Sequence, residues 1–196
     1  ETIEEFYDFA KAYAYLTPPK GNSILFITTS GGAAILGTDA AEREGIEVAP
    51  LPADLAAKLE GVVPAYASRA NPLDLTGDAN AAMFQQVIDL ARPYYDTLGI
   101  IFGDPIVDAS QVVTSGANEL VMFLGGAEVE RMERLKMHQN AVPVYPSPER
   151  AIRALAQVVP AEYKVKPALT TYPMAFGREQ LSVYASFQFL EAQARK

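Results

Sequence analysis

Short apolar runs alternate with segments of helical spacing along most of the chain. An amphipathic segment at residues 3–16 ends at Pro18-Pro19 and predicts a lead-in helix. Beyond it, the short apolar runs predict strands, and apolar residues spaced three and four positions apart predict the helices between them. The predicted strands are 23–29, 46–49, 97–103, 118–125 and 142–145, and the predicted helices are 32–44, 53–60, 79–92, 127–139 and 148–158.

This alternation indicates parallel strands joined by crossover helices. Two of the apolar runs, 98–102 and 120–124, are nearly continuous, as strands buried on both faces should be. We therefore predict an α/β fold with a flavodoxin-like, doubly wound, five-stranded parallel sheet in the order 2-1-3-4-5. In this order the ligand crevice lies at the carboxyl ends of strands 1 and 3.

The pattern divides the chain into three parts. Residues 1–20 form the lead-in helix and a linker, 21–160 the flavodoxin-like domain, and 161–196 an irregular segment with a C-terminal helix from about 178 to 194. We expect that helix to pack on the domain, with a neighbouring domain as the alternative partner. Because the chain begins without Met, straight into helix-like sequence, we also expect it to be a segment of a longer polypeptide.

A glycine turn follows the first predicted strand, in the sequence Thr28-Thr-Ser-Gly-Gly32. A helix that begins there offers unpaired main-chain N–H groups and the positive end of its dipole to an anion. The candidate phosphate contacts are the main chain of Ser30, Gly31, Gly32 and Ala33. The turn has neither the lysine of a P-loop nor the glycine spacing of a dinucleotide site. An equally open alternative is that glycine serves only the geometry of the turn.

A second loop, residues 71–78, precedes the predicted helix at 79–92. By itself it is typical of a turn with Asp78 as a helix cap. If it lies beside the glycine turn, its residues Asn71, Asp74, Thr76 and Gly77 form a second wall around the anion. A third turn, Gly103-Asp-Pro105, ends a strand at the same predicted edge, whereas Gly125-Gly126 indicates only tight turning.

Composition excludes several kinds of function. The net charge of −8 and the isoelectric point near 4.7 argue against a nucleic-acid partner, and the absence of cysteine excludes disulfides and thiolate chemistry. No signal peptide is apparent and no apolar stretch is long enough to span a membrane, so we expect a cytoplasmic protein. The single histidine, His138, ends a predicted helix away from the crevice, and Ser30 has no histidine partner. We expect no metal site and no catalytic residue in this chain.

The chain resembles the ADP-forming (NDP-forming) acyl-CoA synthetases, relatives of succinyl-CoA synthetase. The resemblance covers most of the chain and rests on the order and spacing of six motifs. They are Ile3-Glu-Glu-Phe-Tyr-Asp8, Gly21-Asn22, Thr28-Thr-Ser-Gly-Gly32 with Asp39-Ala40, Asn71-Pro-Leu-Asp-Leu-Thr-Gly-Asp78, Phe123-Leu-Gly-Gly126, and Val142-Pro-Val-Tyr-Pro-Ser-Pro-Glu-Arg-Ala151.

The resemblance implies an enzyme that interconverts acyl-CoA, phosphate and ADP with a free acid, CoA and ATP through a phosphorylated histidine. It implies a CoA-binding domain, a domain that carries the histidine, and an ATP-grasp domain or subunit as partners, with CoA, ATP or ADP and Mg²⁺ used by the full enzyme. This chain resembles the flavodoxin-like ligase domain that steadies the phosphohistidine with a helix N-terminus. The family's Ser-His-Thr-Gly type histidine motif is absent, so we expect the chain alone to be inactive and to bind none of these cofactors by itself.

Two other kinds of function remain open at this stage. A flavodoxin-like electron carrier could use the same turn for the phosphate of FMN. A regulatory or interaction module could keep the fold without the chemistry.

Overall fold

The computed structural model describes residues 2–113, 116–124 and 127–165. Its central feature is a five-stranded sheet in the order β2-β1-β3-β4-β5, and every neighbouring pair is parallel. The strands are β1 (Ile24–Thr28), β2 (Leu73–Asp74), β3 (Thr97–Phe102), β4 (Glu119–Phe123) and β5 (Val144–Tyr145). The predicted α/β fold and strand order are confirmed.

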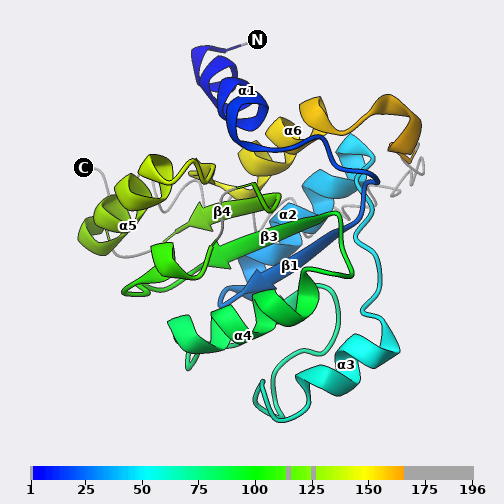
Figure 1. Cartoon of the computed structure of the whole chain (residues 1–196), viewed down its shortest axis with the longest axis vertical. Coiled ribbons are helices and arrows are strands. Elements are labelled where there is room, and N and C mark those ends of the chain that lie inside the picture. The colour runs from blue at the N-terminus through cyan, green and yellow to red at the C-terminus, as the bar shows by residue number, and fades with distance from the viewer. Residues whose placement is uncertain (1, 114–115, 125–126, 166–196) are drawn as a thin grey trace, which may run out of the picture.

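The helices cover both faces of the sheet. They are α1 (Ile3–Tyr15), α2 (Gly31–Glu44), α3 (Ala53–Leu59), α4 (Ala81–Ala91), α5 (Ala127–Gln139) and α6 (Pro148–Val158), with short 3₁₀ turns η1 (Ala109–Gln111) and η2 (Ala161–Tyr163). One core cluster joins α3 and α4 to one face, and a second joins α2 and α6 to the other. Figure 1 shows this layering, with α1 on the outside of α6.

The strands are buried because both of their faces meet helices. All residues of β1, β3 and β4 are buried, including Thr28 and Glu119. Glu119 is stabilised by Arg92, whose Nη2 lies 2.7 Å from its Oε1. A chain segment that is apolar throughout a strand therefore marks a central strand, as the sequence predicted for 98–102 and 120–124.

One strand assignment from the sequence is wrong. Residues 46–49 were predicted as strand 2, yet only Glu47 is paired, through a single bridge to Ser23, the residue before β1. The position next to β1 belongs mainly to Leu73–Asp74, which pairs with Ile27 and Thr28. Both segments are short and lie along the same edge of β1, so an apolar run alone cannot decide between them.

The other boundaries match the prediction or differ from it by at most two residues. The helix predicted at 79–92 begins at Ala81, and its cap is Asn80, whose Oδ1 accepts a hydrogen bond of 3.0 Å from the Met83 N–H. Asp78 is therefore not the cap that the sequence predicted. The predicted helix at about 178–194 lies outside the described residues. Among the helices that the structure describes, none is long and apolar enough to cross a membrane.

Candidate functional site

The turn between β1 and α2 is held by the buried side chain of Thr28. Its Oγ1 accepts a hydrogen bond of 2.8 Å from the Ser30 N–H and donates one of 3.1 Å to the Ser30 carbonyl. Such a hydroxyl turn fixes the direction in which the main chain leaves the strand. Sequence reasoning assigned no part to Thr28, although a threonine at the end of a buried strand is a usable signal for this turn.

The first turn of α2 presents free main-chain donors. Ala34 donates to the Ser30 carbonyl at 3.1 Å, but the N–H groups of Gly31, Gly32 and Ala33 have no partner among the described residues. Ser30 makes no side-chain cap and the first turn holds no acidic residue. No atom lies within 4 Å of the Cβ position at Gly32, so the space there is open. These features are what an oxyanion needs at a helix N-terminus.

The second predicted loop lies against the first. The Leu75 N–H donates to the Thr28 carbonyl at 2.8 Å, which continues the pairing of β1 with β2 beyond the strands. A Cβ at Gly31 would lie 2.9 Å from Oδ2 of Asp74. Asp74 is fixed in turn by the Thr76 N–H, which donates to its Oδ1 at 2.9 Å. The structure thus brings Asp74 and Thr76 to the start of α2.

Thr76 holds an unusual backbone conformation at this point. Its φ of 67° lies in the left-handed region, which a β-branched residue adopts only under strain. Its Oγ1 is buried beside the Tyr66 hydroxyl. The next residue, Gly77, has open space at its Cβ position. Strain of this kind clusters at ligand sites in proteins.

Asn71 occupies a different position from the other residues of its loop. Its side-chain Nδ2 donates to the carbonyls of Ile24 (2.7 Å) and Ala49 (2.8 Å), and its Oδ1 accepts from the Phe26 N–H (3.1 Å). The side chain therefore joins β1 to the segment at 46–49 on the side of β1 that faces away from β3. A cis peptide bond joins Asn71 to Pro72, and the Asn71 side chain makes no hydrogen bond to the α2 donors.

The loop after β3 forms a third side of the site. The Gly103 N–H donates to Oγ1 of Thr29 at 3.0 Å, and a Cβ at Gly103 would lie 2.6 Å from Cβ of Ser30. Only glycine permits this approach, so the turn at 103 does face the same edge as the glycine turn. The predicted turn at Gly125-Gly126 lies outside the described residues.

Exposed apolar side chains occur in the segments that connect the strands. Ile35 and Leu36 lie in α2, Val107 and Leu124 follow β3 and β4, and Tyr66 precedes β2, and their exposed fractions range from 39% to 67%. The group consists of Ile35, Leu36, Tyr66, Val107 and Leu124. The Tyr66 hydroxyl donates to Oδ2 of Asp78 at 2.7 Å, and this hydrogen bond raises the pKa of Tyr66. Apolar groups around a polar centre are typical of a surface that another protein covers.

His138 lies apart from the site at the start of α2. His138 lies in the last turn of α5, near Val144 of β5 and away from the α2 N-terminus. In the part of the chain that the structure describes, no group of three or more His, Asp or Glu side chains could hold a metal ion.

Comparison with known proteins gives a consistent match. The family model described as "Ligase-CoA domain" matches residues 24–164. The chain is 32% identical over 169 residues to the alpha subunit of acetate–CoA ligase (ADP-forming) I of Pyrococcus furiosus, a match that covers 79% of this chain and 36% of that subunit. It is 27% identical to the 4-hydroxybutyrate–CoA ligase (ADP-forming) of Nitrosopumilus maritimus, over 81% of this chain and 24% of that enzyme.

Solved structures agree with the sequence comparison. The dinucleotide-forming acetyl-coenzyme A synthetase 1 of Candidatus Korarchaeum cryptofilum, in complex with phosphate and ADP, superposes with a TM-score of 0.72 at 25% identity. This match covers 81% of the present chain and 37% of that chain. The chain thus spans well under half the length of the relatives it matches.

Proposed function

The chain belongs to the Ligase-CoA domain family of the ADP-forming acyl-CoA synthetases, and from that premise we propose that it is one domain of an acid–thiol ligase. The complete enzyme interconverts an acyl-CoA, phosphate and ADP with a free acid, CoA and ATP. The part of this domain is to stabilise a phosphohistidine that another domain carries. The chain alone does not turn over.

The observation that carries this proposal is the set of unpaired donors at the start of α2. A phosphoryl group on histidine needs its negative charge stabilised without a nucleophile that would accept it. The N–H groups of Gly31, Gly32 and Ala33 meet that need, and the open space at Gly32 gives a phosphoryl group access to them. Together with Ser30 they are the phosphate contacts in this proposal.

Asp74 favours a phosphohistidine over a free phosphate. Its carboxylate lies beside Gly31 and would repel a free dianion. When the second nitrogen of a phosphorylated imidazole is protonated, it donates an N–H, and a carboxylate accepts this hydrogen bond and favours the protonated ring. Thr76 and Gly77 complete this wall, whereas we give Asn71 a supporting part, because its side chain is bound to the sheet.

The apolar side chains around the site support a partner domain. A phosphohistidine must arrive on a protein surface, and Ile35, Leu36 and Val107 offer that surface apolar contacts outside the polar centre. The partners in this proposal are a CoA-binding domain, a domain with the histidine and an ATP-grasp domain or subunit. In this proposal CoA, the nucleotide and Mg²⁺ bind to those partners.

An amide NMR titration of the labelled chain with inorganic phosphate and then with phosphohistidine tests the site. We expect saturable shifts at residues 30–33 and 74–77, with phosphohistidine binding more tightly than phosphate. The Gly32→Leu variant should keep the fold, because no atom lies within 4 Å of that Cβ position, and should lose these shifts.

The control is Ala57→Leu, which introduces the same leucine side chain at an exposed position of α3. It should leave the shifts unchanged. Absence of saturable shifts at 30–33, or binding by Gly32→Leu as tight as in the unchanged chain, would contradict the proposal. In that case an interaction module without the chemistry becomes the better description.

A further inference from the structure

Helix α1 exposes the apolar residues that predict it from the sequence. They are Ile3, Phe6, Tyr7, Ala10, Tyr13 and Ala14, all of them exposed, and the four large side chains are 62% to 66% exposed. Because they recur at intervals of three and four positions, they form one stripe along the helix, and no charged residue lies within it. Figure 1 shows α1 on the outside of the molecule, with α6 as its neighbour.

The opposite side of α1 is attached to the domain by ion pairs. Asp8 is buried, and its carboxylate lies 2.5 Å from Nε of Arg150 in α6 and 3.1 Å from Nζ of Lys11. Nearer the start of the helix, Oε1 of Glu5 lies 2.6 Å from Nη1 of Arg153. The apolar stripe cannot turn inward without breaking these contacts. Helix α1 thus presents to solvent a face that helices ordinarily bury.

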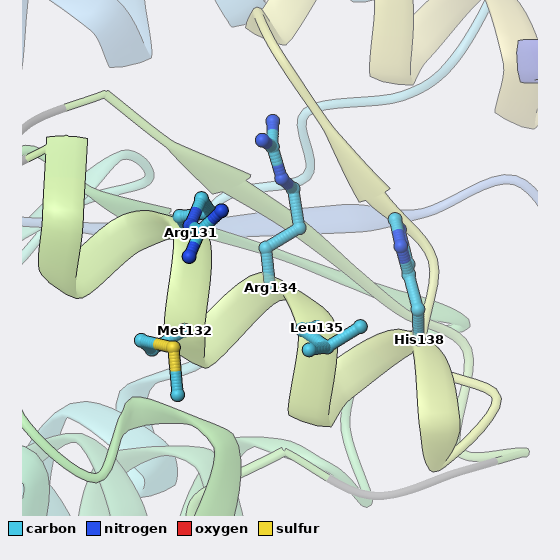
Figure 2. Close-up of a pocket in the computed structure, with 5 residues that line it drawn as sticks. All are labelled: Arg131, Met132, Arg134, Leu135 and His138. Carbon is cyan, nitrogen blue, oxygen red and sulfur yellow. The ribbon is translucent and has the colours of Figure 1, made fainter.

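The outer side of α5 is different. Figure 2 shows Met132 and Leu135 on the same part of that helix as Arg131 and Arg134. Met132 and Leu135 are 48% and 54% exposed, but with charged side chains beside them they form an ordinary solvated surface. An apolar face without interruption, as on α1, is instead typical of a contact with another protein.

The sizes of the residues in the stripe favour a second copy of α1 that runs in the opposite direction. Ile3, Tyr7, Ala10 and Ala14 have the spacing of the core positions of a coiled coil. In an antiparallel pair, with a two-fold axis midway between residues 7 and 10, Tyr7 meets Ala10 of the second copy and Ile3 meets Ala14. Each large side chain then faces a small one. A parallel pair would place Tyr7 against Tyr7 and Ala10 against Ala10, and would be crowded at one level and hollow at the next.

The flanks of the stripe and its area agree with the antiparallel pair. On one flank, Phe6 comes next to Tyr13 of the second copy. On the other, the exposed Glu4 approaches Lys11, whose partner Asp8 is shared with a second cation. Aromatic side chains bury about 150–250 Å² each when they are fully covered, so the two stripes together remove on the order of 1,000 Å² from water. That area is at the lower end for a specific interface.

We propose that this chain forms a two-fold dimer in which α1 packs antiparallel on α1 of a second copy. The interface is small, but α6 already holds each helix in place, so little order has to be gained on association. The dimer therefore dissociates in the micromolar range. The proposal does not rest on the function proposed above.

Sedimentation equilibrium of the chain across the micromolar range tests the dimer. We expect the mass to rise from monomer to dimer with concentration. Tyr7→Ala should weaken dimerisation roughly tenfold or more, because the lost contact occurs twice in a two-fold pair. Tyr163→Ala is the matched control at a tyrosine of η2 that is 41% exposed, and it should leave dimerisation unchanged. Equal weakening by the control would overturn the proposal. A monomer throughout the range would also overturn it, and another domain of the longer enzyme would then be the occupant of the stripe.

An exchange of the two sizes tests the packing itself. Ala10→Tyr alone places a tyrosine against Tyr7 of the second copy and should weaken the dimer roughly tenfold. The double variant Tyr7→Ala/Ala10→Tyr again puts a large residue opposite a small one, so its affinity should return to within about threefold of the unchanged chain. Both positions are exposed, so the variants should keep the fold. A double variant that binds no more tightly than the single variants would overturn the proposal.

The direction of the helices can be read from cross-linking, because the chain has no cysteine of its own. Ile3→Cys and Ala14→Cys chains should form a disulfide when they are mixed. Ile3→Cys alone should not, since the rise of the helix separates its two copies by about 16 Å in the antiparallel pair. Rapid cross-linking of Ile3→Cys alone would indicate parallel helices and would overturn the proposal.

Discussion

Gly31 and Asp74 approach so closely that a Cβ at Gly31 would lie 2.9 Å from Oδ2 of Asp74. The Asp74 carboxylate cannot rotate away from Gly31 without losing the hydrogen bond that its Oδ1 accepts from the Thr76 N–H. This contact joins the two loops that come together at the carboxyl edge of the sheet. Gly31 and Gly32 therefore differ in the room that they leave for a side chain: a Cβ at Gly31 meets Asp74, whereas the space at Gly32 is open.

We expect Gly31→Ala to lower the free energy of unfolding by about 1 kcal/mol, because Asp74 must shift and its hydrogen bond to Thr76 weakens. Gly32→Ala should instead raise it by roughly 0.5 to 1 kcal/mol, since alanine favours the helix and meets no atom within 4 Å. Urea unfolding of the two variants measures both effects. If both substitutions changed the free energy of unfolding in the same direction, the contact between Gly31 and Asp74 would not explain the effect.

Asn71 is expected to matter for the fold rather than only for a ligand. Asn71→Ala leaves the Phe26 N–H and the Ile24 carbonyl of β1 without partners and removes one of the hydrogen bonds to the Ala49 carbonyl, so the free energy of unfolding should fall by about 3 kcal/mol. The helix cap Asn80 is the matched control, and Asn80→Ala should cost about 1 kcal/mol. If both variants lost the same free energy of unfolding in denaturant, Asn71 would not have the proposed role of joining β1 to residues 46–49.

Thr76 offers a test of whether backbone strain serves the site. Asparagine tolerates a positive φ better than threonine, so Thr76→Asn should raise the free energy of unfolding by about 1 kcal/mol. The same variant should weaken phosphohistidine binding in the NMR titration if the strained loop is shaped for the ligand. Ala141→Asn, at a φ of 55° after α5, is the control. Ala141→Asn should be more stable and should bind phosphohistidine as tightly as the unchanged chain. Unchanged phosphohistidine binding by Thr76→Asn would show that the backbone strain at Thr76 does not serve the ligand.

His138 should make the stability depend on pH. Burial, and then the charges of Lys11 and Arg134, lower its pKa in the folded chain from 6.5. As the pH falls through 6.5, the unfolded chain therefore takes up a proton first, and the free energy of unfolding decreases until the lower folded pKa is passed. His138→Gln removes this contribution, so its stability should fall less between pH 7.5 and pH 5.5. Urea unfolding of both proteins at the two pH values measures the difference, and parallel profiles would contradict the lowered pKa.

Much of the fold could be predicted because helices and central strands have strong patterns. The strands β1, β3 and β4 are buried on both faces and appear as apolar runs, so their order followed from the alternation. The error concerned β2, which has only two residues. Its pairing depends on Asn71, which holds the segment at 46–49 and the start of the second loop against β1, and a polar residue in a loop does not reveal such a contact.

The site was predicted in part for a similar reason. The sequence identified the glycine turn and the loop with Asp74 and Thr76, since turn residues have recognisable types. It did not predict the hydrogen bond from Gly103 to Thr29, which joins residues far apart in the chain. The positive φ of Thr76 could not be predicted either, because tertiary contacts impose it against the residue's own preference.

The two edges of the sheet have a consequence for the behaviour of the domain in concentrated solution. β2 and β5 contain two residues each, and each follows a proline, Pro72 or Pro143, which has no N–H to offer. Short edges with few free donors give a strand from another molecule little to pair with. The sheet is therefore poorly suited to grow by strand addition, and the domain should resist this route to aggregation at the high concentrations that ligand titrations require.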